Sequence, residues 1–311
     1  MSYTSIDTPI VMGSGGSVWT HYCNFLALLK PRVMSLVVFT GFVGLFLAPG
    51  DLHPVLQAIA ILCIALGAGA SGAINMWFDR DIDAIMSRTK DRPIPSGRVT
   101  PEAALTFGVL LTGGSVMVMG LAINWLSAFL LALTIGFYIF IYTAWLKRRT
   151  PQNIVIGGAA GAVPPMIGWA AVSGTVTLDS LILFCIIFVW TPPHFWALSL
   201  YRSDDYKAAK IPMLPLTHGR SATCRQIMIY SCILSLTGIL PCFLGTAGVI
   251  YGVLAAALGI LFLIFAWRVV QNDCDKNSKQ LFGFSILYLF LLFSGFLIDK
   301  MIEIPFSFLF I

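Results

Sequence analysis

Asn75, Asp79 and Asp83 are the residues of this chain whose types and spacing best suit chemistry, because they follow one another at intervals of four residues. In a helix this interval places all three side chains on one face. Two carboxylates and an amide oxygen form a hard, all-oxygen ligand set, which suits Mg²⁺ better than zinc. Mg²⁺ is commonly held by one or two carboxylates together with substrate phosphate oxygens. The spacing therefore predicts a magnesium and diphosphate site. Asp81, which lies between the ligands, is expected to point away from them into a surface ion pair.

Basic residues follow this motif within one to two helical turns. Arg88, Lys90 and Arg92 are placed to neutralise the phosphate charge that a metal ion leaves uncompensated. The alternative interpretation is a solvated loop in which carboxylates balance arginines that anchor the chain at a membrane surface. The position of Asn75 at the end of an apolar segment, and the strictly helical carboxylate spacing, favour the metal site.

The rest of the chain must position this site from within a lipid bilayer. Of its 311 residues, 58% are hydrophobic and only 11% are charged, whereas soluble chains average about 25% charged residues. This composition excludes a soluble enzyme, a disordered protein and a nucleic-acid-binding module. The seven cysteines show no CxxC spacing, so they are expected to pack as small apolar residues and not to bind zinc or form disulfides.

Nine apolar segments are long enough to span a bilayer, which requires about 20 residues. They lie at residues 33–49, 54–78, 101–121, 125–146, 154–173, 178–201, 227–246, 249–268 and 281–299. If they cross in alternation, 18 of the 19 Lys and Arg residues fall on one side, and Lys300 alone falls on the other. The positive-inside rule then predicts a cytoplasmic N-terminus and a cytoplasmic site.

The predicted architecture is an all-α polytopic membrane protein. Residues 1–29 contain no Lys or Arg and are expected to form a cytoplasmic tail, and residues 30–311 are expected to form a single transmembrane domain. A bacterial inner membrane is the expected location.

The motif Asn75-x-x-x-Asp79-x-x-x-Asp83 resembles the signature of the UbiA superfamily of membrane-embedded prenyltransferases. A narrower resemblance, to the branch that attaches a farnesyl group to haem, rests on stretches that extend from the first to the sixth segment and into the following loop. These stretches are 30–32, 75–97, 142–153, 157–169, 190–198 and 205–215. The C-terminal third is similar to that branch only in its hydropathy.

This resemblance implies about nine helices around a central cavity, and the conversion of haem B and farnesyl diphosphate into haem O and diphosphate with Mg²⁺. By the same resemblance, Asn75, Asp79 and Asp83 hold a first Mg²⁺, and Asp205 in the second charged loop belongs to a second metal site. In the broader superfamily another aspartate stands four residues later, but here that position is Ala209, so either Asp204 or water is expected to complete the ligand set of the second metal.

The resemblance also suggests which residues contact each substrate. Lys147 and Arg148 either anchor the chain at the membrane surface or contact diphosphate or haem propionates, and Arg32 has the same two interpretations. His194 is either a packing residue or a contact of the haem iron, because imidazole is a common haem ligand and a polar side chain within a span is a functional candidate. The set assigned to diphosphate is Arg88, Arg92, Lys147, Arg148 and Lys207, and the set assigned to haem is His194, Arg32 and Trp190.

Three alternatives remain at this point. A related prenyltransferase acting on a quinone or chlorophyll precursor is disfavoured by the stretches 190–198 and 211–215. A transporter is disfavoured because the carboxylates gather at one surface, and a scaffold for respiratory-chain assembly would not need the Asn75–Asp83 face. Expected partners are the two substrates, the lipid bilayer, and haem A synthase or terminal-oxidase assembly factors, with no nucleic acid.

Overall fold

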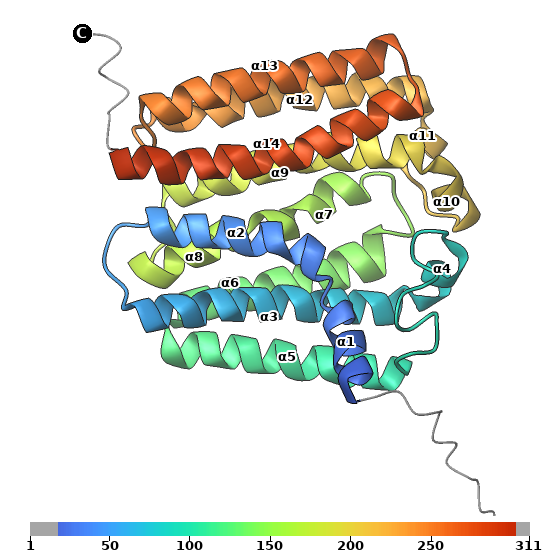
Figure 1. The fold of residues 1–311 in the computed structure, drawn as a ribbon, viewed down its shortest axis with the longest axis horizontal. Coiled ribbons are helices and arrows are strands. Elements are labelled where there is room, and N and C mark those ends of the chain that lie inside the picture. The colour runs from blue at the N-terminus through green and yellow to red at the C-terminus, as the bar shows by residue number, and fades with distance from the viewer. Residues whose placement is uncertain (1–17, 303–311) are drawn as a thin grey trace, which may run out of the picture.

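The computed structural model describes residues 18–302, and every regular element in that range is helical (Figure 1). The elements are α1 (Val18–Leu28), α2 (Pro31–Leu47), α3 (Pro54–Phe78), α4 (Arg80–Ile85), α5 (Pro101–Ala122), α6 (Trp125–Gly136), η1 (Phe137–Leu146), α7 (Asn153–Ala162), α8 (Pro164–Ser173), α9 (Leu178–Tyr201), α10 (Ser203–Ala208), α11 (Leu214–Thr217), α12 (Arg220–Phe243), α13 (Val249–Gln271) and α14 (Asp275–Ile302).

Local sequence signals explain where many of these helices begin. Proline occupies the first turn of α2, α3, α5 and α8, where its missing N–H costs no hydrogen bond. Thr100 caps α5 by accepting a hydrogen bond from the Ala103 N–H at 3.2 Å, and Asn124 caps α6 through the Ser127 N–H at 2.8 Å. Such caps satisfy N–H groups that have no partner within the helix.

The long helices pass back and forth between two ends of the molecule. By length and composition, eight of the described helical segments can cross a membrane, and α6 with η1, like α7 with α8, counts as one crossing. A ninth crossing includes α2, whose 17 residues meet α1 at a bend of 57°. The short elements α4, α10 and α11 lie together at one end of the bundle (Figure 1). The prediction of an all-α protein with about nine transmembrane helices is therefore confirmed.

The observed helices follow the predicted segments closely, with two differences. Helix α12 begins at Arg220 and ends at Phe243, although hydropathy placed this segment at 227–246. Helix α14 begins at Asp275, six residues before the predicted start at 281. Hydropathy marks where the chain leaves the hydrocarbon, whereas a helix continues into the polar region as long as its backbone hydrogen bonds persist. Residues 18–28, which fall within the predicted N-terminal tail, form the helix α1.

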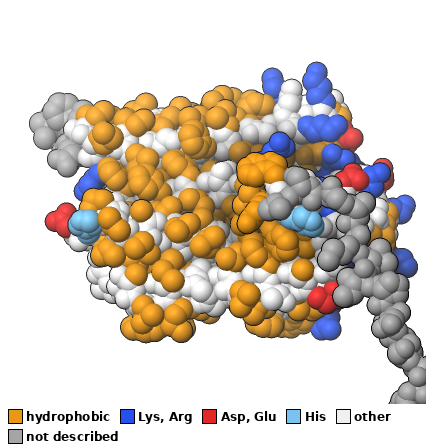
Figure 2. Space-filling model, turned by 60° about the horizontal axis from the view of Figure 1, so that its bottom comes forward, with side chains coloured by type: hydrophobic (Ala, Val, Ile, Leu, Met, Phe, Trp, Pro, Cys, Tyr) orange, Lys and Arg blue, Asp and Glu red, His pale blue; other side chains and the backbone are white. Residues whose placement is uncertain are grey.

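The surface confirms a multi-pass membrane protein. Large apolar side chains are exposed along the long helices, including Leu110, Phe129 and Leu236. In Figure 2 hydrophobic side chains cover the middle of the visible face, whereas most Lys and Arg side chains gather at one end. A bilayer is the solvent that makes such a surface stable.

Close backbone contacts join the helices inside the bundle. A Cβ atom on Gly44 of α2 would lie 2.1 Å from the Pro165 carbonyl oxygen of α8, and one on Gly168 would lie 2.0 Å from the Gly41 carbonyl oxygen. Small residues of this kind let membrane helices approach closely. Gly157 of α7 makes a similarly close contact, since an added Cβ would lie 2.2 Å from the Tyr142 side chain.

At the end of the bundle opposite α4, a buried carboxylate joins α14 to the start of α13. Asp299 near the end of α14 accepts hydrogen bonds from the Gly248 N–H at 2.5 Å and the Tyr251 N–H at 3.2 Å. Both N–H groups belong to the start of α13, where a negative charge is favourable. One helix therefore caps another at this end.

Candidate active site

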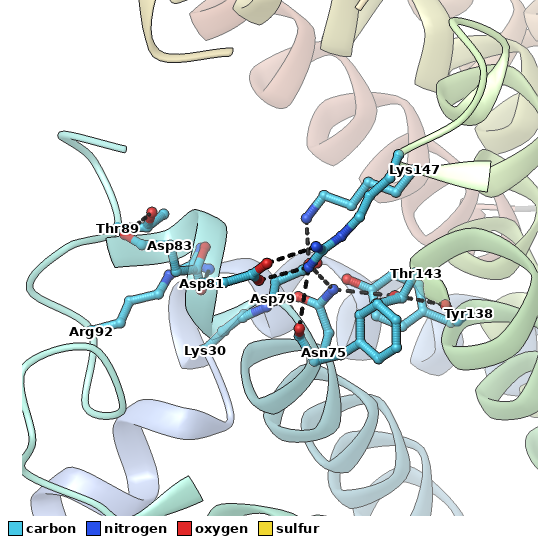
Figure 3. A network of polar contacts seen from close by, with 12 residues as sticks. Lys30, Asn75, Asp79, Asp81, Asp83, Thr89, Arg92, Tyr138, Thr143 and Lys147 are labelled. Atoms are coloured by element: carbon cyan, nitrogen blue, oxygen red, sulfur yellow. Dashed lines mark hydrogen bonds and ion pairs between the residues drawn. The ribbon is translucent and has the colours of Figure 1, made fainter. Parts of the chain in front are cut away.

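Asn75 and Asp79 form the centre of a buried polar cluster at the end of α3 (Figure 3). The Asn75 amide donates to Asp79 Oδ2 at 2.8 Å and to Thr143 Oγ1 at 3.2 Å, and its oxygen accepts from Lys30 Nζ at 2.8 Å. Lys147 forms an ion pair with Asp79. Three separate segments of the chain therefore supply the groups around this carboxylate.

Asp83 lies one turn further on, in α4, and is also buried. Arg92 donates to Asp83 Oδ2 at 2.6 Å, and the Thr89 hydroxyl donates to the Asp83 carbonyl oxygen at 2.9 Å. The Asp83 N–H in turn donates to the Asp79 carbonyl oxygen at 2.8 Å, so the helical spacing continues across the junction of α3 and α4. The structure thus places Asn75, Asp79 and Asp83 in succession within one buried region, each paired with a basic residue.

Asp81 points away from this cluster, as the sequence predicts. Its carboxylate accepts two hydrogen bonds of 2.7 Å from the Arg148 guanidinium, and its side chain is 60% exposed. These hydrogen bonds hold the pKa of Asp81 below its usual range. Arg148 also lies 3.5 Å from Asp79 Oδ1, so it connects the surface pair with the buried site.

The π-helix η1 sets the position of Thr143 and Lys147. Thr143 donates to the Tyr138 carbonyl oxygen at 2.8 Å, and the Lys147 N–H donates to the Tyr142 carbonyl oxygen at 2.9 Å. The first is a bond of the Thr143 side-chain hydroxyl, whereas the second is a backbone hydrogen bond across five residues, the spacing of a π-helix; π-helical turns are frequent at functional sites. Tyr138 and Tyr142 stack with ring centroids 5.3 Å apart beside this region.

The second charged loop reaches the first one through Asp205. This carboxylate accepts from the Ser87 N–H at 3.2 Å and from the Ser87 hydroxyl at 2.9 Å. Apolar contacts between the two loops and the start of α7 close the junction. The two aspartate-bearing loops therefore meet, and Asp205 contacts the first loop through Ser87 and not through Asp79 or Asp83.

Several predicted site residues lie outside these contacts. Arg88, Lys207 and Arg32 are exposed, and no ion pair holds any of them within residues 18–302. Arg88 lies close enough to Tyr206 of α10 to lower the pKa of its phenol, although burial is the larger influence and raises that pKa. Of the five residues assigned to diphosphate, the structure brings Arg92, Lys147 and Arg148 to the buried acids.

His194 and Trp190 lie within α9, and the ring and hydrogen-bond contacts that they make outside this helix within the described residues are with α14. Both are buried, and their rings stack with centroids 4.3 Å apart. His194 Nδ1 lies 2.6 Å from the Ser285 hydroxyl, and the Trp190 indole donates to the Ser285 carbonyl oxygen at 2.8 Å. These two residues form a second, largely apolar site between α9 and α14.

The acids can accommodate a divalent cation. Asp79 Oδ1 is buried and accepts no hydrogen bond, and its basic neighbour Arg148 is 3.5 Å away, so this oxygen retains capacity for a further ligand. The donor set of Asn75, Asp79 and Asp83 is all oxygen, as Mg²⁺ prefers. Within the described range no three His, Cys, Asp or Glu side chains form a candidate metal cluster by themselves, so an amide or substrate oxygen has to complete the coordination.

Sequence reasoning missed Lys30 and Thr143. Lys30 carries the side chain that reaches Asn75, and its backbone has a left-handed conformation with φ 52°, which is unusual for a residue with a side chain. The junction of Lys30 and Pro31 was the available signal, because Pro31 opens α2 and leaves Lys30 at the bend between two helices. Thr143 had no comparable signal, since only η1 brings it next to Asn75.

The fold and this cluster define a membrane-embedded prenyltransferase, and comparison with known proteins agrees. The UbiA prenyltransferase family model matches residues 37–294, so the chain belongs to that family, as its motifs predict. Among solved structures, it is similar to a digeranylgeranylglyceryl phosphate synthase (TM-score 0.75, 17% identity, 90% of this chain and 98% of that one). It is also similar to a UbiA homologue from Archaeoglobus fulgidus bound to GPP and Mg²⁺ (TM-score 0.65, 17% identity, 88% and 99%).

Curated proteins that are far more similar in sequence than these solved structures are named protoheme IX farnesyltransferase. A protein of Rhizobium johnstonii named protoheme IX farnesyltransferase is 59% identical over 303 residues, which cover 96% of each chain. A protein of Parvibaculum lavamentivorans with the same name is 60% identical over 283 residues, covering 90% of this chain and 89% of that one.

Proposed function

We propose that this protein transfers the farnesyl group of farnesyl diphosphate to a vinyl group of haem B and so produces haem O. The allylic carbon–oxygen bond breaks and releases diphosphate, a carbon–carbon bond forms to the vinyl group, and water supplies the new hydroxyl while losing a proton. The observation that carries the proposal is the identity of about 60% to relatives named protoheme IX farnesyltransferase over nearly the whole chain.

The charge of the buried cluster suits a metal-bound diphosphate. Arg92 and Lys147 pair with the carboxylates of Asp83 and Asp79, and Lys30 contacts Asn75 beside them, so three basic groups lie around two buried carboxylates. A diphosphate ester with one Mg²⁺ has a small net negative charge. The metal ion, when held by Asn75, Asp79 and Asp83, would supply charge stabilisation to the leaving diphosphate. Arg92 and Lys147, which pair with Asp83 and Asp79, would then turn to the phosphate oxygens.

The remaining residues favour the reaction by excluding water. The stacked Tyr138 and Tyr142 lie next to the polar cluster, and their ring faces can stabilise an allylic cation. Apolar walls protect that cation until the vinyl group is in place. We assign Asp205 to the second metal site, Arg88, Arg148 and Lys207 to the outer phosphate oxygens, and Trp190, His194 and Arg32 to haem.

We place the charged end of the bundle in the cytoplasm of a bacterial inner membrane, because the Lys and Arg residues are concentrated there. The domain division into a tail at 1–29 and a catalytic unit at 30–311 remains a prediction. Haem A synthase and oxidase assembly factors also remain predicted partners.

The decisive experiment incubates the purified protein with haem B, farnesyl diphosphate and Mg²⁺, followed by mass analysis of the haem. We expect one farnesyl group and one water to be added. Asp79→Asn should lose about 10³-fold in turnover, because removing a metal ligand costs several kcal/mol of transition-state stabilisation. Asp81→Asn is the matched control and should stay within a few-fold of the natural protein.

Two results would overturn this assignment. Prenylation of a quinone precursor in place of haem would refute the acceptor, and near-normal turnover of Asp79→Asn with Mg²⁺ present would refute the metal site. Full turnover in an excess of chelator would also exclude the metal.

A further inference from the structure

The imidazole of His194 is fixed on three sides. Trp190 stacks on it at 4.3 Å and Phe282 at 4.6 Å, with interplanar angles of 18° and 23°, and Phe195 lies edge-on at 5.1 Å. Ser285 contacts Nδ1 at 2.6 Å. The rings and the hydroxyl provide no negative charge to balance an imidazolium, so the ring is neutral and carries one proton.

The hydrogen bonds of Ser285 decide which nitrogen carries that proton. The Ser285 hydroxyl lies 2.6 Å from the carbonyl oxygen of Phe282, and a carbonyl oxygen can only accept. The single hydroxyl proton is therefore directed to Phe282. Consequently Ser285 Oγ can only accept at its short contact with His194, and Nδ1 must be the donor.

A proton on Nδ1 leaves the lone pair on Nε2. The two ring nitrogens have separate roles, and the hydrogen bond of one selects the chemistry of the other. Histidines that bind metals usually donate their second N–H to an acceptor, which fixes the tautomer and the orientation of the ring. Ser285 occupies that position here, on a helix separate from the one that carries His194.

We infer that Ser285 is a positioning residue that holds His194 as the Nδ1–H tautomer and so presents Nε2 as an axial ligand to the iron of the haem substrate. This inference rests on the proposed function for the identity of the ligand, whereas the tautomer follows from the contacts alone. Ser285 lies in α14, outside the stretches whose motifs carry the resemblance in the sequence.

The tautomer can be measured without haem. The protein contains four histidines, so ¹⁵N-histidine labelling followed by NMR in lipid, with His194→Gln to assign the signals, reports the protonation of each His194 nitrogen. We expect protonated Nδ1 and unprotonated Nε2 in the natural protein and in Ser285→Thr. Ser285→Val, which has the shape of threonine without the hydroxyl, should move the proton to Nε2.

Haem binding then tests the consequence. Optical titration with haem B should give a histidine-type spectrum, with affinity about 10- to 100-fold weaker in Ser285→Val and nearly unchanged in Ser285→Thr. Ser278→Ala is a second control, because Ser278 lies two turns earlier on the same face of α14, is buried, and has no hydrogen-bond partner for its hydroxyl in the described structure. Farnesyl diphosphate binding should be equal in all these proteins.

The outcomes separate this inference from the proposed function. An Nε2–H tautomer in the natural protein would overturn the inference, as would a haem spectrum and affinity that Ser285→Val leaves unchanged. If the natural protein binds no haem, the proposed function fails together with the iron ligand. Farnesylation of haem by a protein whose His194 is an Nε2–H tautomer would leave the function intact and refute the role of Ser285.

Discussion

Replacing Arg92 by leucine should destabilise the protein in the absence of Mg²⁺, because the buried carboxylate of Asp83 loses its ion-pair partner. Arg92 is the ion-pair partner of Asp83 in the described structure, at 2.6 Å, with side-chain exposures of 21% and 3% respectively. Removing one partner of a buried ion pair costs about 3–5 kcal/mol, because the remaining charge is uncompensated. Since Arg92 retains some access to solvent, we expect about 2–4 kcal/mol for Arg92→Leu.

The double variant Arg92→Leu/Asp83→Asn isolates the cause. An amide at position 83 carries no charge, so most of the loss should be recovered, and the double variant should be more stable than Arg92→Leu alone. Thermal unfolding in detergent measures this, and about 2 kcal/mol corresponds to several degrees in Tm for a chain of this size. Lys90→Met, which removes an exposed charge from the same loop, is the control and should change Tm little.

Mg²⁺ provides the second arm of this test. In Arg92→Leu the metal ion no longer competes with a guanidinium for Asp83, so saturating Mg²⁺ should raise Tm more than it does in the natural protein. Ligand at about 100 times its Kd stabilises by about 2.7 kcal/mol. Equal Tm values for Arg92→Leu and the double variant, with no larger response to Mg²⁺, would refute the view that Asp83 is a buried charge shared between Arg92 and a metal.

Three further changes test the packing of the helices and the orientation of Asn75. Asp299→Ala should cost about 2–4 kcal/mol in thermal unfolding, because two N–H groups at the start of α13 lose their acceptor, whereas turnover per folded molecule should stay normal. Thr143→Val should reduce kcat about tenfold by removing a hydrogen bond that orients Asn75, while Thr143→Ser should stay near normal; equal rates would exclude that role. Gly157→Ala should displace Tyr142 and destabilise the protein by about 1–3 kcal/mol. An unchanged Tm together with full activity would refute this, because it would mean that α7 can move away from Tyr142 with no loss of stability.

The order of the helices was predictable because hydropathy is a local property. Each crossing is a run of about 20 apolar residues, and proline or a capping side chain marks where many of these runs begin. For the same reason the predicted segments 54–78, 125–146 and 178–201 match the observed helices. The predicted boundaries shifted where a helix extends beyond the hydrocarbon, as at Arg220 and Asp275, and the helix α1 was not predicted.

The motif of Asn75, Asp79 and Asp83 was predictable because three ligands on adjacent turns belong to one segment. Helical geometry alone brings them together, and the orientation of Asp81 toward the surface follows from the same spacing. The ion pairs of Asp79 with Lys147 and of Asp83 with Arg92 were not predicted, because the sequence analysis assigned both basic residues to diphosphate.

The sequence by itself therefore determined the helices, the class of protein and the acidic half of the site. The tertiary structure decided which distant residues complete it: Lys30 from the bend before α2, Thr143 and Lys147 from η1, and Ser285 from α14. These contacts join residues 45 to 91 positions apart in the chain. No local pattern specifies such pairs, because they depend on how the helices pack against one another and on the extra residue per turn that a π-helix introduces.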